Sequence, residues 1–163
     1  MSKTVANLQE AFAGESQANR KYLAFAKKAR TEGYEGVARL FEAAAAAETI
    51  HAHKHLRTLK GVKSTQENLQ EAIAGETHEF KSMYPKMIEE AKAEGEKQAE
   101  ISFTYANEVE KVHARLYEEA LNSLDSFPVE DYYVCNICGY TVAKAAPERC
   151  PVCGAQQKQF FKV

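Results

Sequence analysis

The residues best suited to chemistry are two Glu-x-x-His pairs and two Cys-x-x-Cys pairs. The Glu-x-x-His pairs are Glu48 with His51 and Glu110 with His113. On a helix, side chains three positions apart share one face, so each pair presents a carboxylate and an imidazole together. Carboxylates are hard ligands that can bridge two cations, and imidazole suits iron. The pairs therefore indicate a metal site carried by helices.

Both Glu-x-x-His pairs belong to an internal repeat that also supplies single glutamates. LQEAFAGE at residues 8–15 and LQEAIAGE at residues 69–76 differ at one position, and they end on Glu15 and Glu76. The alternative is that two helices rich in Ala and Glu resemble each other by chance. The two Glu-x-x-His pairs also match at nearly the same offset as the lone glutamates, which argues against chance. Each half supplies a lone glutamate and one Glu-x-x-His pair. Together the halves give the ligand set of di-iron and di-manganese carboxylate bundles.

The halves differ three residues after the lone glutamate. Glu79 follows Glu76 on the same helical face, whereas Ala18 follows Glu15. We therefore expect Glu79 to be a fifth carboxylate ligand rather than an ordinary surface glutamate. The other histidines have no counterparts in the repeat, and we interpret them as surface residues: His53, His55 and His78.

Four cysteines form a second group near the C-terminal end: Cys135, Cys138, Cys150 and Cys153. Two Cys-x-x-Cys turns supply four thiolates to one tetrahedral metal. A glycine after the second cysteine of each turn lets the backbone aim N–H groups at sulfur. Zinc would make this group a structural ribbon and iron would make it a one-electron relay, and the spacing is compatible with both.

Four helices must position the carboxylates and imidazoles, because residues 4–123 contain a single proline and are rich in Ala, Glu, Lys and Leu. We predict a four-helix bundle with helices at residues 4–31, 35–60, 65–93 and 97–122. Gly33, Gly61 and Gly95 mark the joints, where the left-handed conformation is available to glycine. Ser64 with Glu67 suggests a capping box for the third helix. Pro85 should bend that helix.

The sequence pattern changes after Ser123, where the helical periodicity ends. We predict a bundle domain at residues 1–123, a linker at residues 124–131 and a cysteine-bearing module at residues 132–163. A piece of this length cannot bury a self-sufficient core, so a bound metal must hold it together. The formal net charge of −2 does not suggest nucleic acid or an anionic membrane as a partner. Without an apolar span or a secretory signal, the sequence favours a cytoplasmic protein.

These motifs together resemble the rubrerythrin family, which joins a ferritin-like di-iron bundle to a rubredoxin-like iron module. AGES, ETIHAHKH, AGETHEF, EKVHARLY, CNICGY and CPVCG all stand in the expected order. The resemblance implies two iron ions held by five carboxylates and two imidazoles, and one iron held by the four thiolates. It implies that one iron exchanges His51 for Glu79 on oxidation. It also implies that Tyr22 and Tyr84 lie beside the di-iron centre.

The activity implied by the resemblance is reduction of hydrogen peroxide to water in defence against oxidative stress. Electrons would come from an external donor, a rubredoxin or a reductase, through the four-thiolate iron. A head-to-tail homodimer is expected, because the linker would otherwise have to fold the module straight back along its own bundle. Two alternatives remain: a ferritin-like iron oxidation and storage protein, and a zinc-ribbon binding module on a helical scaffold.

Overall fold

The computed structural model describes residues 2–163, which divide into two compact units. The first unit ends at Lys63, and the second runs from Ser64 to Val163. Long helices make up most of the chain, and a small sheet lies near the C-terminal end. The predicted fold class, mainly helical with a small cysteine-bearing β module, is confirmed. No helix of the described residues is long and apolar enough to cross a membrane.

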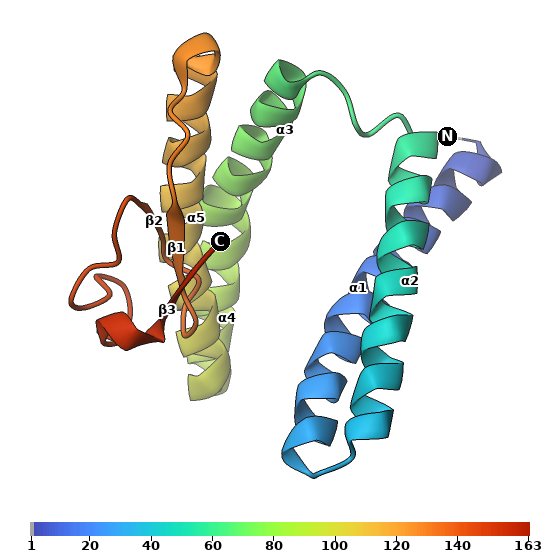
Figure 1. The fold of residues 1–163 in the computed structure, drawn as a ribbon. Coiled ribbons are helices and arrows are strands. Elements are labelled where there is room, and N and C mark those ends of the chain that lie inside the picture. Colours follow the sequence, from blue (N-terminus) through green and yellow to red (C-terminus); the bar gives the residue numbers. More distant parts are fainter. Residues whose placement is uncertain (1) are drawn as a thin grey trace. The chain divides into compact units, whose positions relative to one another are not determined.

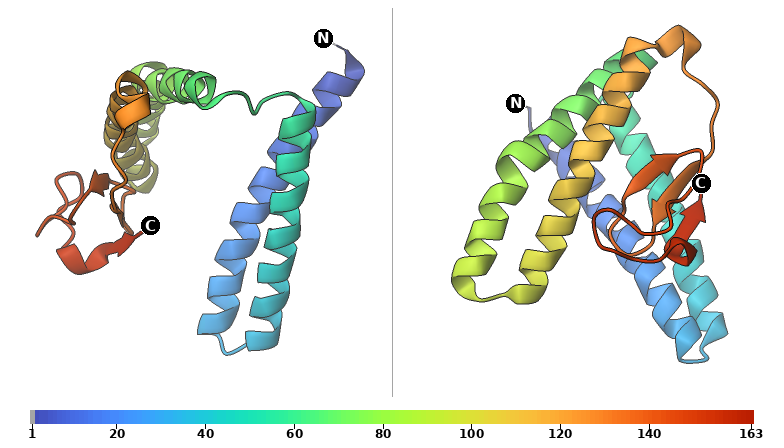
Figure 2. Two further views of the ribbon diagram at one scale, coloured as in Figure 1. Left: turned by 45° about the horizontal axis from the view of Figure 1, so that its top comes forward. Right: turned by 90° about the vertical axis from the view of Figure 1, so that its left-hand side faces the viewer.

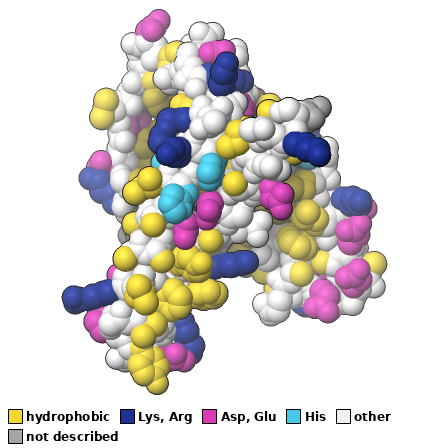
Figure 3. All heavy atoms as spheres, turned by 90° about the vertical axis from the view of Figure 1, so that its right-hand side faces the viewer, with side chains coloured by type: hydrophobic (Ala, Val, Ile, Leu, Met, Phe, Trp, Pro, Cys, Tyr) yellow, Lys and Arg dark blue, Asp and Glu magenta, His cyan; other side chains and the backbone are white. Residues whose placement is uncertain are grey.

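The first unit is a helical hairpin of α1 (Lys3–Thr31) and α2 (Glu35–Thr58), which lie side by side in Figures 1 and 2. Small side chains fill the seam between the two helices: Ala26, Ala29, Ala38, Ala45 and Ala52. A pair of helices cannot bury all of its apolar surface. Large hydrophobic side chains such as Phe25 and Leu40 therefore remain exposed. Figure 3 shows hydrophobic side chains at the surface beside charged ones, with histidines next to carboxylates.

The second unit contains α3 (Thr65–His78), η1 (Glu79–Met83), α4 (Tyr84–Glu94) and α5 (Lys97–Asn122). The predicted capping box is present: the backbone N–H of Glu67 donates to the Ser64 hydroxyl, and the Ser64 N–H donates to the Glu67 carboxylate. This reciprocal pair satisfies backbone donors that the first turn of a helix otherwise leaves free. Both α3 and α4 pack along α5, which makes α5 the central helix of this unit.

The predicted bend at Pro85 takes the form of a wide turn just before the proline. Residues Glu79–Met83 form a π-helix, and the Tyr84 N–H donates to the carbonyl of Glu79, five residues back. Proline has no N–H and crowds the preceding turn, so the regular hydrogen-bond ladder cannot pass through it. The extra residue of a π-turn absorbs this disruption without ending the helix. Because the turn begins at Glu79, it also sets the direction of that side chain.

The joints of the helices follow the prediction except at Gly61. Gly33 and Gly95 are left-handed, with φ of 85° and 75°. After α2, however, Lys60 adopts the left-handed conformation, with φ of 57°. Gly61 instead provides room, since a Cβ there would collide with the side chain of Leu56. The prediction that the helix ends near Gly61 was correct, but the left-handed residue is Lys60, one position earlier than predicted.

The C-terminal module begins after the short turn η2 (Leu124–Ser126). Its sheet has the order β2-β1-β3, with β1 (Tyr132–Cys135) between β2 (Thr141–Ala143) and β3 (Phe160–Lys162). Both pairings are antiparallel. The turn η3 (Gln157–Gln159) leads into the last strand. Strands this short cannot hold a fold alone, which leaves cohesion to the cysteines between them.

Candidate metal centres

The first ligand group lies in the α1–α2 hairpin and brings together Glu15, Glu48 and His51. One potential ligand atom from each residue lies within 4.8 Å of the others. Glu48 Oε2 and His51 Nδ1 are 2.9 Å apart, as the spacing of three on one helix predicts. The two glutamates are half-buried, whereas 54 % of the His51 side chain is exposed. The structure therefore brings three of the predicted metal ligands together in the first hairpin.

A buried asparagine that the sequence argument missed fixes the two helices beside this group. Asn19 Nδ2 donates to the carbonyl oxygen of Ala45, at 2.7 Å, and to the hydroxyl of Thr49, at 2.8 Å. These bonds join α1 to α2 one turn from Glu15 and Glu48. A buried amide needs such partners, because an unpaired polar group in an apolar seam is costly. The available signal was the position of Asn19, four residues after Glu15 on the same helical face.

The second ligand group lies in the other unit and brings together Glu76, Glu110 and His113. Their ligand atoms also lie within 4.8 Å of one another. Glu110 Oε2 is 2.8 Å from His113 Nδ1, and Glu76 Oε1 is 3.8 Å from the same nitrogen. His113 is less exposed than His51, with 27 % of its side chain accessible. The two groups thus repeat one arrangement on separate hairpins.

The electrostatics of the second group are those of carboxylates crowded together. Burial, followed by the charge of Glu110, raises the pKa of Glu76 to about 7. Burial and the charge of Glu110 also raise the pKa of Glu79, which places that carboxylate near the group. The hydrogen bond that the His113 ring donates to the Glu110 carboxylate raises the pKa of His113. A bound cation would offset this excess of negative charge, so the donor set fits a metal such as iron.

Two tyrosines of the second unit lie close to these carboxylates. Burial and then the charge of Glu79 raise the pKa of Tyr84. Burial and then the charge of Glu76 raise the pKa of Tyr117. Tyr84 was among the predicted site residues, whereas Tyr117 was missed. The available signal for Tyr117 was its place four residues after His113, on the same helical face.

Tyr22, which the family resemblance places beside the di-iron centre, lies in an aromatic cluster of the first hairpin. Its ring centroid is 6.4 Å from that of Phe25 and 6.1 Å from that of Phe41. These contacts are ordinary packing between aromatic rings, and Tyr22 is half-buried. Its role beside a metal remains a prediction. The three histidines interpreted as surface residues join no metal-binding group in the described part of the chain; His53 and His78 are exposed, and His55 is half-buried.

The four cysteines converge as the spacing predicts. Cys135 Sγ lies 3.7 Å from Cys153 Sγ, and Cys138 Sγ lies 3.5 Å from Cys150 Sγ. Four sulfurs around one ion at a tetrahedral metal–sulfur distance of about 2.3 Å would be about 3.8 Å apart. These thiols are therefore spaced for a shared ion rather than for disulfides.

The turns around the thiols aim backbone donors at sulfur. Gly139 and Gly154 have φ of 85° and 74°, the left-handed conformation that curls each turn. Burial raises the pKa of Cys138. Burial also opposes ionisation of Cys150, but backbone N–H groups, among them that of Val152, lower the pKa of its thiol. Such hydrogen bonds stabilise thiolates and adjust the properties of a metal bound to them.

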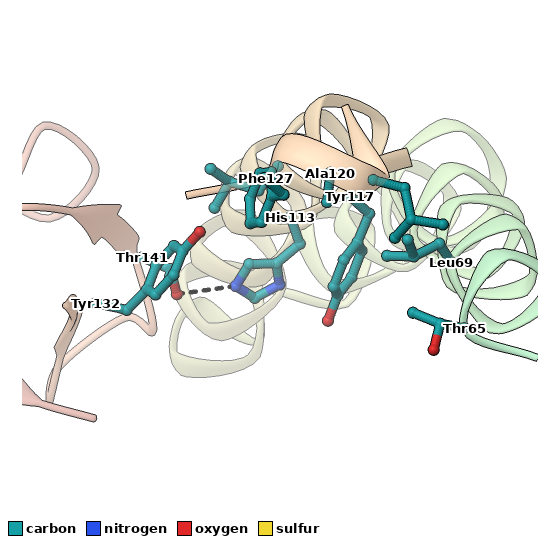
Figure 4. Close-up of a pocket in the computed structure, with 10 residues that line it drawn as sticks. Thr65, Leu69, His113, Tyr117, Ala120, Phe127, Tyr132 and Thr141 are labelled. Carbon is teal, nitrogen blue, oxygen red and sulfur yellow. Dashed lines mark hydrogen bonds between the residues drawn. The ribbon is translucent and has the colours of Figure 1, made fainter. Parts of the chain in front are cut away.

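The module folds back along α5 of its own unit. The His113 Nε2 atom lies 3.1 Å from the hydroxyl of Thr141 in β2, and a Cβ on Gly139 would touch Val109. A largely apolar cavity of about 480 Å³ lies beside this contact, with His113 in its wall (Figure 4). The linker therefore does allow the module to reach its own α5. The length of the linker therefore gives no reason to expect a head-to-tail dimer, and the dimer itself stays a prediction.

Helical carboxylate–histidine groups and a four-thiolate site in one chain define a class of metalloprotein, the di-iron carboxylate proteins with a rubredoxin-like module. Comparison with known proteins gives the family. The family model described as Rubrerythrin matches residues 6–121, and the model described as Rubrerythrin, rubredoxin-like domain, matches residues 133–161. The chain belongs to the rubrerythrin family.

Individual relatives match along nearly their whole length. Rubrerythrin-2 of Clostridium acetobutylicum is 38 % identical over 170 residues, covering 94 % of this chain and 92 % of that protein. Nigerythrin of Nitratidesulfovibrio vulgaris is 40 % identical over 167 residues, covering 94 % of this chain and 83 % of that protein. The solved structure of fully reduced, all-ferrous nigerythrin is 37 % identical, with a TM-score of 0.61; it covers 100 % of this chain and 88 % of that one. The resemblance to the rubrerythrin family that the motifs predict is thereby confirmed.

Proposed function

We propose that this protein reduces hydrogen peroxide to water in defence against oxidative stress, as an oxidoreductase with a di-iron centre. The observation that carries the proposal is that one chain holds two carboxylate–histidine groups and a four-thiolate site, and that the module bearing the thiolates contacts His113 through Thr141. Reduction of one peroxide consumes two electrons and two protons. Two metal ions, when bound, would supply both electrons at one place, and a one-electron relay would return them singly.

The chain offers a distinct role to each set of side chains. Five carboxylates and two imidazoles would hold the metal pair: Glu15, Glu48, Glu76, Glu79, Glu110, His51 and His113. Two iron ions, when bound, would each give one electron to the O–O bond. We further propose that Glu79 replaces His51 as a ligand on oxidation, because an added anion favours the higher charge.

Protons for the product waters can be held by side chains at the site. Tyr84 keeps its phenolic proton at neutral pH, because burial raises its pKa. Its O–H can therefore donate a hydrogen bond to an oxygen atom of the bound peroxide. Tyr22 would donate such a hydrogen bond from the first hairpin. Glu79 also holds a proton more readily than an exposed glutamate, because burial raises its pKa too.

The four-thiolate site distinguishes this proposal from iron storage. A storage protein oxidises iron and deposits it as mineral, and it does not need a one-electron site beside its ligands. The four cysteines Cys135, Cys138, Cys150 and Cys153 would instead hold an iron that passes single electrons to the di-iron centre. The donor that reduces this iron would be a rubredoxin or a reductase. A head-to-tail homodimer, a cytoplasmic location and domain boundaries at residues 123 and 131 also stay parts of the proposal. Because the module contacts His113 of its own chain, we expect electrons to pass within each chain even in such a dimer.

Anaerobic loading with ferrous iron tests the proposal. The visible spectrum should show an iron–thiolate chromophore, and metal analysis should find two further irons per chain. Adding hydrogen peroxide to the reduced protein should oxidise both sites and consume peroxide without releasing hydroxyl radical. Uptake of many irons per chain, with slow peroxide consumption, would favour storage. Zinc in the thiolate site, with no redox change in the protein, would favour the binding module.

A further inference from the structure

His113 differs from the other ligand histidine in that both of its ring nitrogens have partners. Nδ1 faces Glu110 Oε2 at 2.8 Å, and Nε2 faces Thr141 Oγ1 at 3.1 Å (Figure 4). Glu110 lies on the same helix, but Thr141 comes from the cysteine-bearing module, 28 residues further along the chain. The module therefore contacts the second ligand group directly through this side chain.

The direction of the Thr141 hydrogen bond follows from a count of hydrogens. A threonine hydroxyl has one hydrogen to donate and can accept through its lone pairs. Thr141 Oγ1 donates that hydrogen to the carbonyl oxygen of Gly139, at 3.0 Å. It can only accept from His113, so Nε2 must carry a hydrogen. Nδ1 faces the carboxylates of Glu110 and Glu76, and its lone pair becomes available to a cation once that cation takes the place of the hydrogen that Nδ1 shares with Glu110.

We propose that Thr141 is a positioning residue that holds His113 with Nε2 protonated and Nδ1 free to bind metal. This inference rests on the proposed di-iron site and adds to it a residue from the relay module. A histidine that binds metal usually donates its second N–H to an acceptor, which fixes both its tautomer and its ring orientation. Thr141 supplies that acceptor from a strand that begins three residues after Cys138.

His51 has no such support in its own unit. Among the described residues of that hairpin, its one hydrogen-bond partner is Glu48, through Nδ1. Its side chain is twice as exposed as that of His113, 54 % against 27 %. The two halves of the repeat therefore differ in their histidines as well as at Glu79. His113 is fixed by two hydrogen-bond partners, whereas His51 is fixed by one within the described part of its hairpin. This difference explains why the ligand exchange proposed above would take place at His51.

The test uses full-length protein loaded with zinc, which avoids paramagnetic broadening. Long-range ¹H–¹⁵N NMR of the histidine rings should show His113 bound to metal through Nδ1, with a slowly exchanging Nε2–H. A His113→Gln variant identifies the signals. Thr141→Val should speed exchange of the Nε2–H and weaken zinc binding at the carboxylate site by about 10–100-fold. Thr141→Ser, which keeps the hydroxyl, should behave as the wild type.

Thr31→Val is the matched control, because among residues 2–163 that hydroxyl bonds only to the carbonyl of Lys27 on its own exposed helix turn. Wild-type spectra with metal on Nε2 would overturn the proposal whether or not Thr141→Val folds. Unchanged zinc affinity and unchanged Nε2–H exchange in a folded Thr141→Val protein would also overturn it. None of these measurements needs peroxide. If they succeed while the iron-loaded protein fails to reduce peroxide, the proposed function fails and the role of Thr141 stands.

Discussion

Removing the metal should leave a protein whose stability falls as the pH rises, and Glu76 should be the main cause. Its pKa rises from an ordinary value of 4.5 to about 7 in the folded protein, chiefly through burial. The folded state therefore holds a proton that the unfolded state has lost between these two values. Stability falls with pH wherever the folded state binds more protons. The loss begins near the unfolded pKa and is complete above about pH 7.

The size of the loss can be bounded from the shift. The difference of 2.5 between 4.5 and about 7 corresponds to about 3.4 kcal/mol at 1.36 kcal/mol per pKa unit. Because 19 % of the Glu76 side chain is exposed, solvent screening reduces this bound to about 1–2 kcal/mol. His113 acts in the same direction. Its raised pKa gives stability at low pH that is lost as the pH rises through the folded value.

Chemical unfolding of the metal-free protein at pH 5 and pH 8, followed by circular dichroism, measures this effect. The wild type should lose about 1–2 kcal/mol more than Glu76→Gln over this range, because the amide cannot ionise. Glu89→Gln, at an exposed position of α4, is the control and should follow the wild type. Metal-loaded protein should show the opposite slope, since protons compete with the metal for its ligands. Equal pH dependence in wild type and Glu76→Gln would refute the reasoning.

Three further outcomes follow from the ligand groups and the position of the module. Glu110→Ala should lose at least one of the two carboxylate-bound irons and keep the thiolate chromophore; full occupancy by metal analysis would remove Glu110 from the ligand set. Glu79→Ala should still bind ferrous iron but consume peroxide more slowly in stopped-flow assays, and wild-type turnover would make Glu79 a surface residue. Co-expressed Cys150→Ser and Glu110→Ala chains should stay as inactive as either variant alone, because the module contacts His113 of its own chain; recovered activity would instead show transfer between chains.

The ligand groups could be predicted from sequence because local geometry decides them. Glu48 and His51 lie on one helix, as do Glu110 and His113, and a spacing of three sets their distance before any tertiary contact forms. The thiolate site follows similarly from two tight turns with left-handed glycines. Helix boundaries were also accessible, since Ser64 and Gly95 are strong end signals.

What the sequence could not supply depends on contacts between elements that lie far apart in the chain. The Asn19 bonds to α2 and the contact of Thr141 with His113 join residues 26 to 30 positions apart, and no periodic pattern marks them. The π-turn could be predicted only in part. Pro85 indicates that the helix is disturbed nearby, but it does not indicate that a π-turn accommodates the disturbance. The position of the module was misjudged because the reach of a linker limits where a domain can lie without selecting one place.

The contact between Thr141 and His113 changes how the two metal sites depend on each other. Thr141 reaches the histidine from β2, which pairs with the strand that ends on Cys135, so the order of β2 depends on the ion that the thiolates bind. Loss of that ion should release the module and, with it, the acceptor that holds the His113 tautomer. The thiolate site would then support the carboxylate site structurally as well as by supplying electrons. The two ligand histidines of the duplicated hairpin differ in their support because only the second half carries this module, and this difference adds to the one at Glu79.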